Sequence, residues 1–198
     1  MNNCGDNVLT AIIGVAGTLL GTILGWFLNV LSNKGKLSVF LESWSDSLKG
    51  RSRIGSIDVV TLLDDAIYFE YRCTIEIHNG SSTTKIIRAA HLLFCSGKTI
   101  LMKVVPRDIS KSIYNGPAVF YKDIGAYNIP ANQIITIPLT GSLMKKEQGL
   151  DWLSKVDRIL FEYIDERNHK RTVLLKKLDN NNTFDFMEEQ NGQDEDAE

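Results

Sequence analysis

The sequence predicts a single N-terminal transmembrane helix followed by an all-β domain that folds as an antiparallel sandwich. Two observations support this prediction. Residues 8–31 form an apolar run, with no charged residue between Asp6 and Lys34. After this run, stretches of alternating apolar and polar residues are separated by turn sequences, and only one short helical pattern interrupts them.

The apolar run, residues 8–31, is long enough to cross a bilayer. A helix of this length rises about 36 Å at roughly 1.5 Å per residue, and the hydrocarbon core is about 30 Å thick. The leader before it, residues 1–7, contains no Lys or Arg, and no A-x-A cleavage pattern follows the run. The alternative is a buried helix, but a chain this small could hardly surround a helix that is apolar on every side. We therefore expect a retained anchor.

The charges that flank the run predict its orientation. Before the run, only Asp6 and the α-amino group are charged. The basic residues that follow it are Lys34, Lys36, Lys49, Arg51 and Arg53. Because basic residues prefer the cytoplasmic side, we expect a single-pass protein of the cell membrane, with the N-terminus outside and the large domain in the cytoplasm. The same residues are expected to be attracted to an anionic leaflet, with Trp26, Lys34 and Lys36 at the membrane interface.

Small residues recur along the apolar run at spacings of three and four. They are Gly14, Gly17, Thr18, Gly21 and Gly25, and we call them the glycine face. Residues with this spacing share one side of a helix, and their small size lets a second helix approach closely. The sequence therefore predicts a homo-oligomer that packs through the glycine face.

The rest of the chain divides into a joint, a domain and a tail. Residues 32–36 form the joint, residues 37–178 the predicted cytoplasmic β-sandwich, and residues 179–198 a tail with 8 acidic residues and no basic ones. The 22 basic and 16 acidic residues before the tail leave that part with a net charge of +6. Since the tail has few apolar residues to bury, we expect it to be disordered.

Several segments carry strand patterns, and the clearest is residues 69–78, where apolar and polar residues alternate without interruption. The others are residues 37–44, 85–95, 99–105, 119–121, 133–139, 157–164 and 170–178. Residues 69–78 and 85–95 are expected to pair as a hairpin across the turn at 79–82. Residues 45–65 and 108–117 are expected to be loops, and residues 143–153 to be helical.

Seven or so strands joined by turns and by one short helix argue against alternating strand–helix units. They favour an antiparallel sandwich that resembles the immunoglobulin-like class. The cysteines that flank a core Trp in that class are missing, so the resemblance is to the general architecture alone. A small closed β-barrel is the alternative.

Cys4, Cys73 and Cys95 form no disulfide framework, and buried free thiols suit a reducing cytoplasm.

The sequence contains no recognisable motif for catalysis, a cofactor or a metal. His78, His91 and His169 are scattered without metal-ligand spacing, and the phosphate-loop, dinucleotide and hydrolase patterns are missing. Basic residues lack the clustering typical of a nucleic-acid surface. We therefore expect no catalytic residue, no cofactor, no metal and no nucleic-acid partner, and the sequence does not indicate an enzyme.

Two functions are compatible with these features. The first is a membrane-anchored module that binds or scaffolds a cytoplasmic protein partner and self-associates through the glycine face. Its docking surface is expected at an exposed sheet edge near residues 133–139. The alternative is a ligand-sensing membrane effector, in which the β domain binds a small anionic molecule and the helices perturb the bilayer. The positive body permits such a ligand without requiring it.

Overall fold

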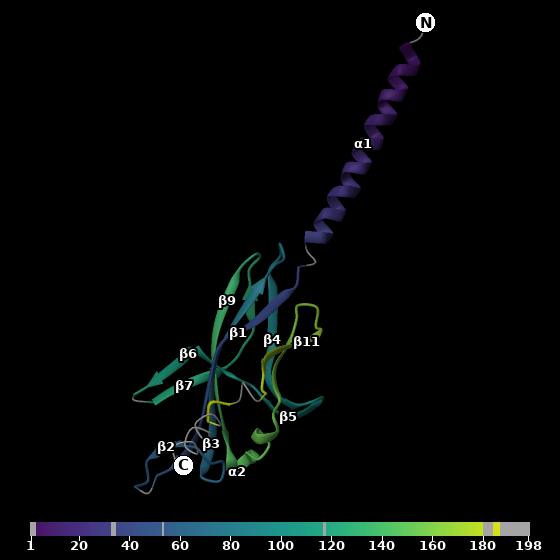
Figure 1. Ribbon diagram of the computed structural model, residues 1–198. Helices are drawn as coiled ribbons and strands as arrows, with labels where there is room; N and C mark the ends of the chain where they lie inside the picture. The colour runs from purple at the N-terminus through teal and green to yellow at the C-terminus, as the bar shows by residue number, and fades with distance from the viewer. Residues whose placement is uncertain (1–2, 33–34, 53, 117, 180–183, 187–198) are drawn as a thin grey trace.

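A long helix extends away from a β domain in the computed structural model, which describes residues 3–32, 35–52, 54–116, 118–179 and 184–186 (Figure 1). Helix α1 (Asn3–Ser32) begins inside the expected leader, so it is longer than the apolar run. Its segment Ala11–Leu31 is long and apolar enough to cross a membrane, and none of it is buried. The alternative of a buried core helix is therefore wrong.

The β domain consists of two antiparallel sheets. The six-stranded sheet has the order β2 (Ile57–Val60), β1 (Leu37–Arg51), β3 (Ala66–Asn79), β9 (Ile134–Met144), β6 (Arg107–Asn115) and β7 (Ala118–Asp123). The second sheet has the order β11 (Lys170–Lys177), β10 (Arg158–Ile164), β4 (Lys85–Ser96) and β5 (Thr99–Val104), and β8 (Tyr127–Ile129) pairs with the start of β4. Within the described residues both sheets keep open edges, so the closed barrel is wrong and the antiparallel all-β prediction is confirmed.

The core lies between the two sheets and is rich in aromatic side chains. The alternating pattern of β3 places Phe69 and Tyr71 on its buried face. Phe94 on β4 meets both of them across the core, with ring centroids 6.3 Å from Phe69 and 6.0 Å from Tyr71. Trp44 on β1 stacks on Tyr71 at 5.5 Å. Contacts of this kind join the two sheets into one hydrophobic unit.

The core also includes a segment of the expected tail. Phe184 and Phe186 are 1% and 2% exposed, and their rings lie 5.6 and 6.1 Å from Phe69. The prediction of disorder from residue 179 is therefore wrong for these two residues, because they bury enough aromatic surface to hold the segment in place. The other tail residues, 180–183 and 187–198, lie outside the described part of the chain.

The expected hairpin between residues 69–78 and 85–95 is wrong, although both segments are strands. β3 pairs with β1 and β9, whereas β4 pairs with β10, β5 and β8. The buried side chain of Asn79 explains the difference, because its amide donates to the carbonyls of Thr83, Ile129 and Pro130 at 2.8–2.9 Å. These bonds direct the chain from one sheet to the other. Cys73 and Cys95 consequently lie on different sheets as buried free thiols.

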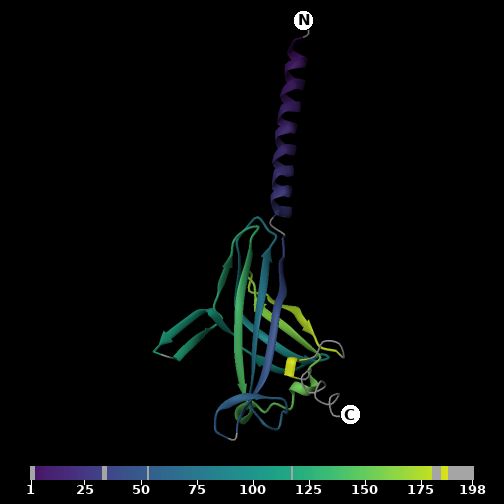
Figure 2. The same ribbon diagram turned by 60° about the vertical axis from the view of Figure 1, so that its left-hand side comes forward.

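Two segments expected as loops contain strands. β1 continues through residue 51 and β2 follows, so most of residues 45–65 belong to the six-stranded sheet. Their many Ser and Asp residues conceal a buried alternation that includes the fully buried Leu48. Residues 108–117 belong mostly to β6, which forms a hairpin with β7; we call this hairpin the arm, and it projects sideways from the body (Figure 2). Because most arm side chains are exposed, no periodicity indicated a strand there.

The helix expected over residues 143–153 is reduced to two short turns. Leu143 is a buried residue near the end of β9, and α2 (Lys145–Gln148) follows. Gly149 ends α2 with a φ of 64°, a conformation that glycine adopts readily. A 3-10 turn (Leu153–Lys155) then leads into β10. The apolar spacing that suggested a helix comes from leucines in separate elements.

Candidate functional site

The glycine face is open along α1. A Cβ atom added to Gly14, Gly17, Gly21 or Gly25 would meet nothing within 4 Å. The hydroxyl of Thr18 donates to the carbonyl of Gly14 at 2.8 Å, so this polar group is satisfied inside the helix. The glycine face therefore carries only small side chains, and its Thr18 hydroxyl already has an acceptor. Helix pairs in membranes pack through surfaces of this kind. Its packing against a second helix stays a prediction.

The joint is held against the β domain at Gly35. A Cβ atom on Gly35 would lie 2.5 Å from the carbonyl oxygen of Gly80 and 2.5 Å from the Cα of Ser81, both in the connection between β3 and β4. Only glycine permits this approach of two backbones. The chain between α1 and β1 is therefore fixed at this point. Lys36 is exposed beside it, Trp26 lies exposed on α1, and Lys34 lies outside the described residues.

The basic residues expected near the membrane do not stay together. β1 is one extended strand of 15 residues, so Arg51 lies about 45 Å from Leu37 at roughly 3.3 Å per residue. Lys49 lies beside it at the same distant end. Since exposed charges are screened beyond about 8 Å in physiological salt, Lys49 and Arg51 cannot act together with Lys36. The attraction of the basic flank to an anionic leaflet stays a prediction, and Arg53 lies outside the described residues.

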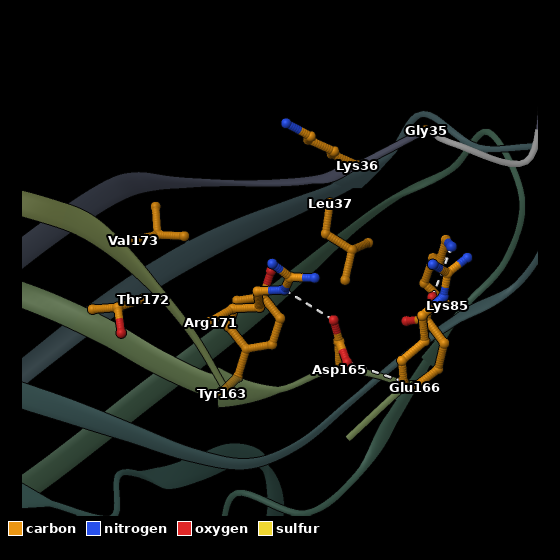
Figure 3. Close-up of a pocket in the computed structure, with 11 residues that line it drawn as sticks. Gly35, Lys36, Leu37, Lys85, Tyr163, Asp165, Glu166, Arg171, Thr172 and Val173 are labelled. Atoms are coloured by element: carbon orange, nitrogen blue, oxygen red, sulfur yellow. Dashed lines mark hydrogen bonds and ion pairs between the residues drawn. The ribbon is translucent and has the colours of Figure 1, made fainter. Parts of the chain in front are cut away.

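A pocket of about 380 Å³ opens beside the joint instead, and we call it the joint pocket (Figure 3). It lies between the two sheets, where the start of β1 faces the β10–β11 turn and the start of β11. Leu37 points into the pocket from β1, opposite Tyr163 and Arg171, and Lys36 lies at the rim (Figure 3). Lys85 enters from the start of β4. Segments far apart in the sequence thus meet where the chain turns toward α1.

Both acids of the joint pocket already have partners. Asp165 accepts from the backbone amides of Arg167 and His169 at 3.0 and 2.8 Å, and from Arg171 Nε at 2.9 Å. Glu166 accepts from Lys85 Nζ at 2.7 Å. Burial acts to raise the pKa of Asp165, but the hydrogen bonds from His169, Arg171 and Arg167 outweigh it, so that pKa is lowered. Burial also acts to raise the pKa of Glu166, and the hydrogen bond from Lys85 outweighs it in the same way. Both carboxylates are therefore ionised at neutral pH.

The pocket retains a surplus of positive charge after this pairing. The residues around it include four cations and two carboxylates, a net charge of +2. Lys36 contributes from the rim, because its side chain points away from that of Leu37 (Figure 3). The cations are Lys36, Lys85, Arg167 and Arg171. Within the described part of the chain, the side chains of Lys36 and Arg167 form no ion pair. The site can therefore attract an anion.

Sequence reasoning missed Lys85, Arg167 and Arg171 as site residues. A local signal was present in the basic run Arg167-Asn168-His169-Lys170-Arg171, which spans a predicted turn and the start of the strand expected over residues 170–178. Nothing in the spacing could place that turn beside residue 36, because the contact depends on the order of the strands. Among the described residues, no group of three or more His, Cys, Asp or Glu side chains is arranged to hold a metal ion.

The expected docking edge near residues 133–139 is covered by β6 only at its end. β9 pairs with β3 from Ile134 to Met144, whereas its other side pairs with β6 only at Leu139 and Thr140. The edges of the six-stranded sheet are β2 and β7. The arm that contains β7 exposes large apolar side chains on its surface. They are Ile113, Tyr114, Val119 and Phe120, and Tyr114 is 74% exposed.

The comparison with known structures shows only distant similarity. A protein from Archaeoglobus fulgidus aligns with a TM-score of 0.32 and 11% identity, over 70% of this chain and 99% of that one. A structure assigned to ApaA from Bordetella pertussis aligns with a TM-score of 0.35 and 11% identity, over 73% and 91%. Scores this low support no conclusion about this chain.

The sequence comparisons are more informative. A relative in Bacillus subtilis (strain 168), the SPbeta prophage-derived uncharacterized protein YopI, is 26% identical over 177 residues, which are 88% of this chain and 98% of that protein. Residues 35–176 match the family model of the YopI Ig-like domain. This match begins at the fixed glycine of the joint and ends in β11, so it covers both sheets. An immunoglobulin-like domain therefore follows the apolar helix, and the chain belongs to the YopI Ig-like domain family.

Proposed function

We propose that this chain is a single-pass, membrane-anchored interaction module whose immunoglobulin-like domain faces the cytoplasm. The observation that supports the proposal is the exposure of α1, because residues 11–29 are all exposed and almost entirely apolar. Contiguous apolar surface of this extent is rarely left in water, and a bilayer would cover it.

The anchoring and orientation are tested on the full chain in cells. Alkaline carbonate extraction should leave the protein in the membrane pellet, and its release into the supernatant would contradict the proposal. For orientation, a membrane-impermeant maleimide added outside intact cells should label Cys4, and Cys4→Ser should abolish the labelling. Cys73 and Cys95 are buried, and burial raises the pKa of Cys73 to about 12, so neither should react in the folded domain.

We further propose that the glycine face holds two or more copies together. Gly21→Leu should reduce cross-linked dimers in membranes, because the larger side chain separates the helices. Since a Cβ at Gly21 meets no atom of its own chain, the fold should tolerate the change. Ala16→Leu is the matched control, because Ala16 lies on the opposite side of the helix. Equal dimer yields for the two variants would contradict this interface.

The arm supports a protein-binding role for the domain. It combines an open edge strand, β7, with exposed apolar side chains, which are features that strand addition uses. A photo-crosslinker at Tyr114 should capture a protein partner in membranes, whereas one at Leu174, which is 54% exposed on β11, should not. Capture of the same proteins from both positions would contradict an arm-specific contact.

The joint pocket favours the second candidate function, a ligand-sensing effector, because its surplus positive charge lies beside the segment that leads to α1. In that case, an anionic ligand would change the packing of the helices and permeabilise the membrane. Uptake of a membrane-impermeant dye into expressing cells distinguishes the two functions. An interaction module leaves the membrane intact, whereas an effector admits the dye and loses this activity in Gly21→Leu.

A further inference from the structure

We propose that the joint pocket binds the phosphate of an anionic lipid headgroup. This inference rests on the proposed membrane anchoring and names a ligand class for the site. A phosphodiester suits the pocket because guanidinium and ammonium groups bind phosphate oxygens, and the two pocket carboxylates are already engaged by Arg171 and Lys85. Arg167, which forms no ion pair among the described residues, is then available to a phosphate in the pocket. Lys36 points away from Leu37 and can meet the same headgroup only from the rim (Figure 3).

The position of the pocket along the chain favours a lipid as the source of the phosphate. Lys36 follows Ser32, the last residue of α1, by four residues, which span at most about 14 Å when extended. The headgroup layer of one leaflet is roughly 5–8 Å thick. The pocket rim therefore lies within reach of the headgroups if α1 spans the bilayer.

Gly35 keeps the pocket beside the point where the chain enters the β domain. Gly35 packs against the backbone of Gly80 and Ser81, so the first residues of β1 keep a fixed place relative to the rest of the domain. The rim residue Lys36 follows directly, and Leu37 points into the pocket (Figure 3). A headgroup bound here would contact both sheets, since Arg167 belongs to the β10–β11 turn and Lys36 to the approach of β1.

The test uses the full chain in detergent micelles that contain equal amounts of phosphatidylglycerol and phosphatidylcholine. Native mass spectrometry measures which lipid stays bound. Phosphatidylglycerol should be retained about tenfold over phosphatidylcholine, whose choline cation offsets the phosphate charge. Lys36→Gln combined with Arg167→Gln should bring this ratio close to one. The matched control, Lys49→Gln with Arg51→Gln, removes the same charge at the far end of β1 and should keep the wild-type ratio.

Two results would overturn the inference. One is an equal retention of both lipids by the wild type, and the other is an equal loss of preference in both double variants. Glycerol 1-phosphate distinguishes a soluble ligand: if it binds in a manner that depends on Lys36 and Arg167 while phosphatidylglycerol is not retained, the lipid assignment is wrong. Carbonate extraction measures anchoring separately, so a failure of the proposed function is recognised without reference to the lipid ratio.

Discussion

The backbone amide of Asp46 donates a 3.0 Å hydrogen bond to Oδ2 of Asp185, 139 residues further along the chain. In the opposite direction, the amide of Phe186 donates to Oδ1 of Asp46 at 3.4 Å. Trp44 Nε1 donates to the other oxygen of Asp46 at 2.7 Å. These bonds fix the segment 184–186 on β1, beside the core that its two aromatic residues enter. The two carboxylates nevertheless lie close enough to repel each other.

The protein is expected to become more stable as the pH falls from 7.5 to 5 because of Asp46. Burial, with a contribution from the charge of Asp185, raises the pKa of Asp46 from 3.8 to about 6. The folded state therefore takes up a proton as the pH falls through 6, whereas the unfolded chain does so only near 3.8. The gain is about 1 kcal/mol at pH 5, which raises the unfolding midpoint by about 3 °C.

Thermal unfolding of the full chain in nonionic detergent measures this gain, and Asp46→Asn should lack it. Carboxylates with lowered pKa values, such as Asp165 and Glu166, lose their stabilising charge only below this range and do not obscure it. A wild-type midpoint that falls steadily from pH 7.5 to pH 5, in parallel with the variant, would contradict the prediction.

The segment 184–186 is expected to be required for full stability. Phe184→Ala removes a fully buried ring that packs against Phe69 and Phe186, and it should cost about 3 kcal/mol and lower the unfolding midpoint by about 10 °C. Phe120→Ala is the control, because Phe120 is 56% exposed on the arm and its loss should shift the midpoint by less than about 2 °C. Similar midpoints for the two variants would show that the segment does not belong to the core.

The parts of the fold that the sequence predicted are those with strong local patterns. The alternation in β3 identified its buried face, and the long apolar run identified α1. The errors arose where tertiary contacts decide the structure. Leu48 is buried in a polar-looking stretch because β1 continues along β3, and Asn79 redirects the chain through bonds to residues about 50 positions away. No local pattern reports such contacts.

The candidate site was predictable only at the joint. The positive flank of the run pointed to Lys36, but the strand that follows carries Lys49 and Arg51 to the other end of the domain. The β10–β11 turn and the start of β11 supply Arg167 and Arg171 in their place. These basic residues were visible in the sequence, whereas their position depends on which strand of the second sheet lies opposite β1. Strand order across two sheets is not encoded in residue spacing.

Asp108 is expected to hold the base of the arm. Its carboxylate is fully buried and accepts hydrogen bonds from Tyr127 and Ser110, with Lys111 Nζ at 3.0 Å. Asp108→Ala would leave these donors without their acceptor, and we expect a loss of about 2 kcal/mol and faster proteolysis of the arm. Asp123→Ala is the control, because Asp123 is exposed on β7. Limited proteolysis with equal cleavage rates in both variants would contradict the anchoring role.

The contact at Gly35 is expected to tolerate no side chain. Gly35→Ala places a methyl group 2.5 Å from the backbone of Gly80 and Ser81, which cannot move aside as a flexible side chain can. The joint must shift or the β3–β4 connection must deform, at a cost of about 2 kcal/mol and a midpoint lowered by about 6 °C. Gly125→Ala is the matched control, because a Cβ there meets nothing within 4 Å. If Gly35→Ala unfolds at the wild-type midpoint and its joint is cleaved no faster by protease than that of Gly125→Ala, the joint is not held by this contact and the pocket beside it has no fixed position.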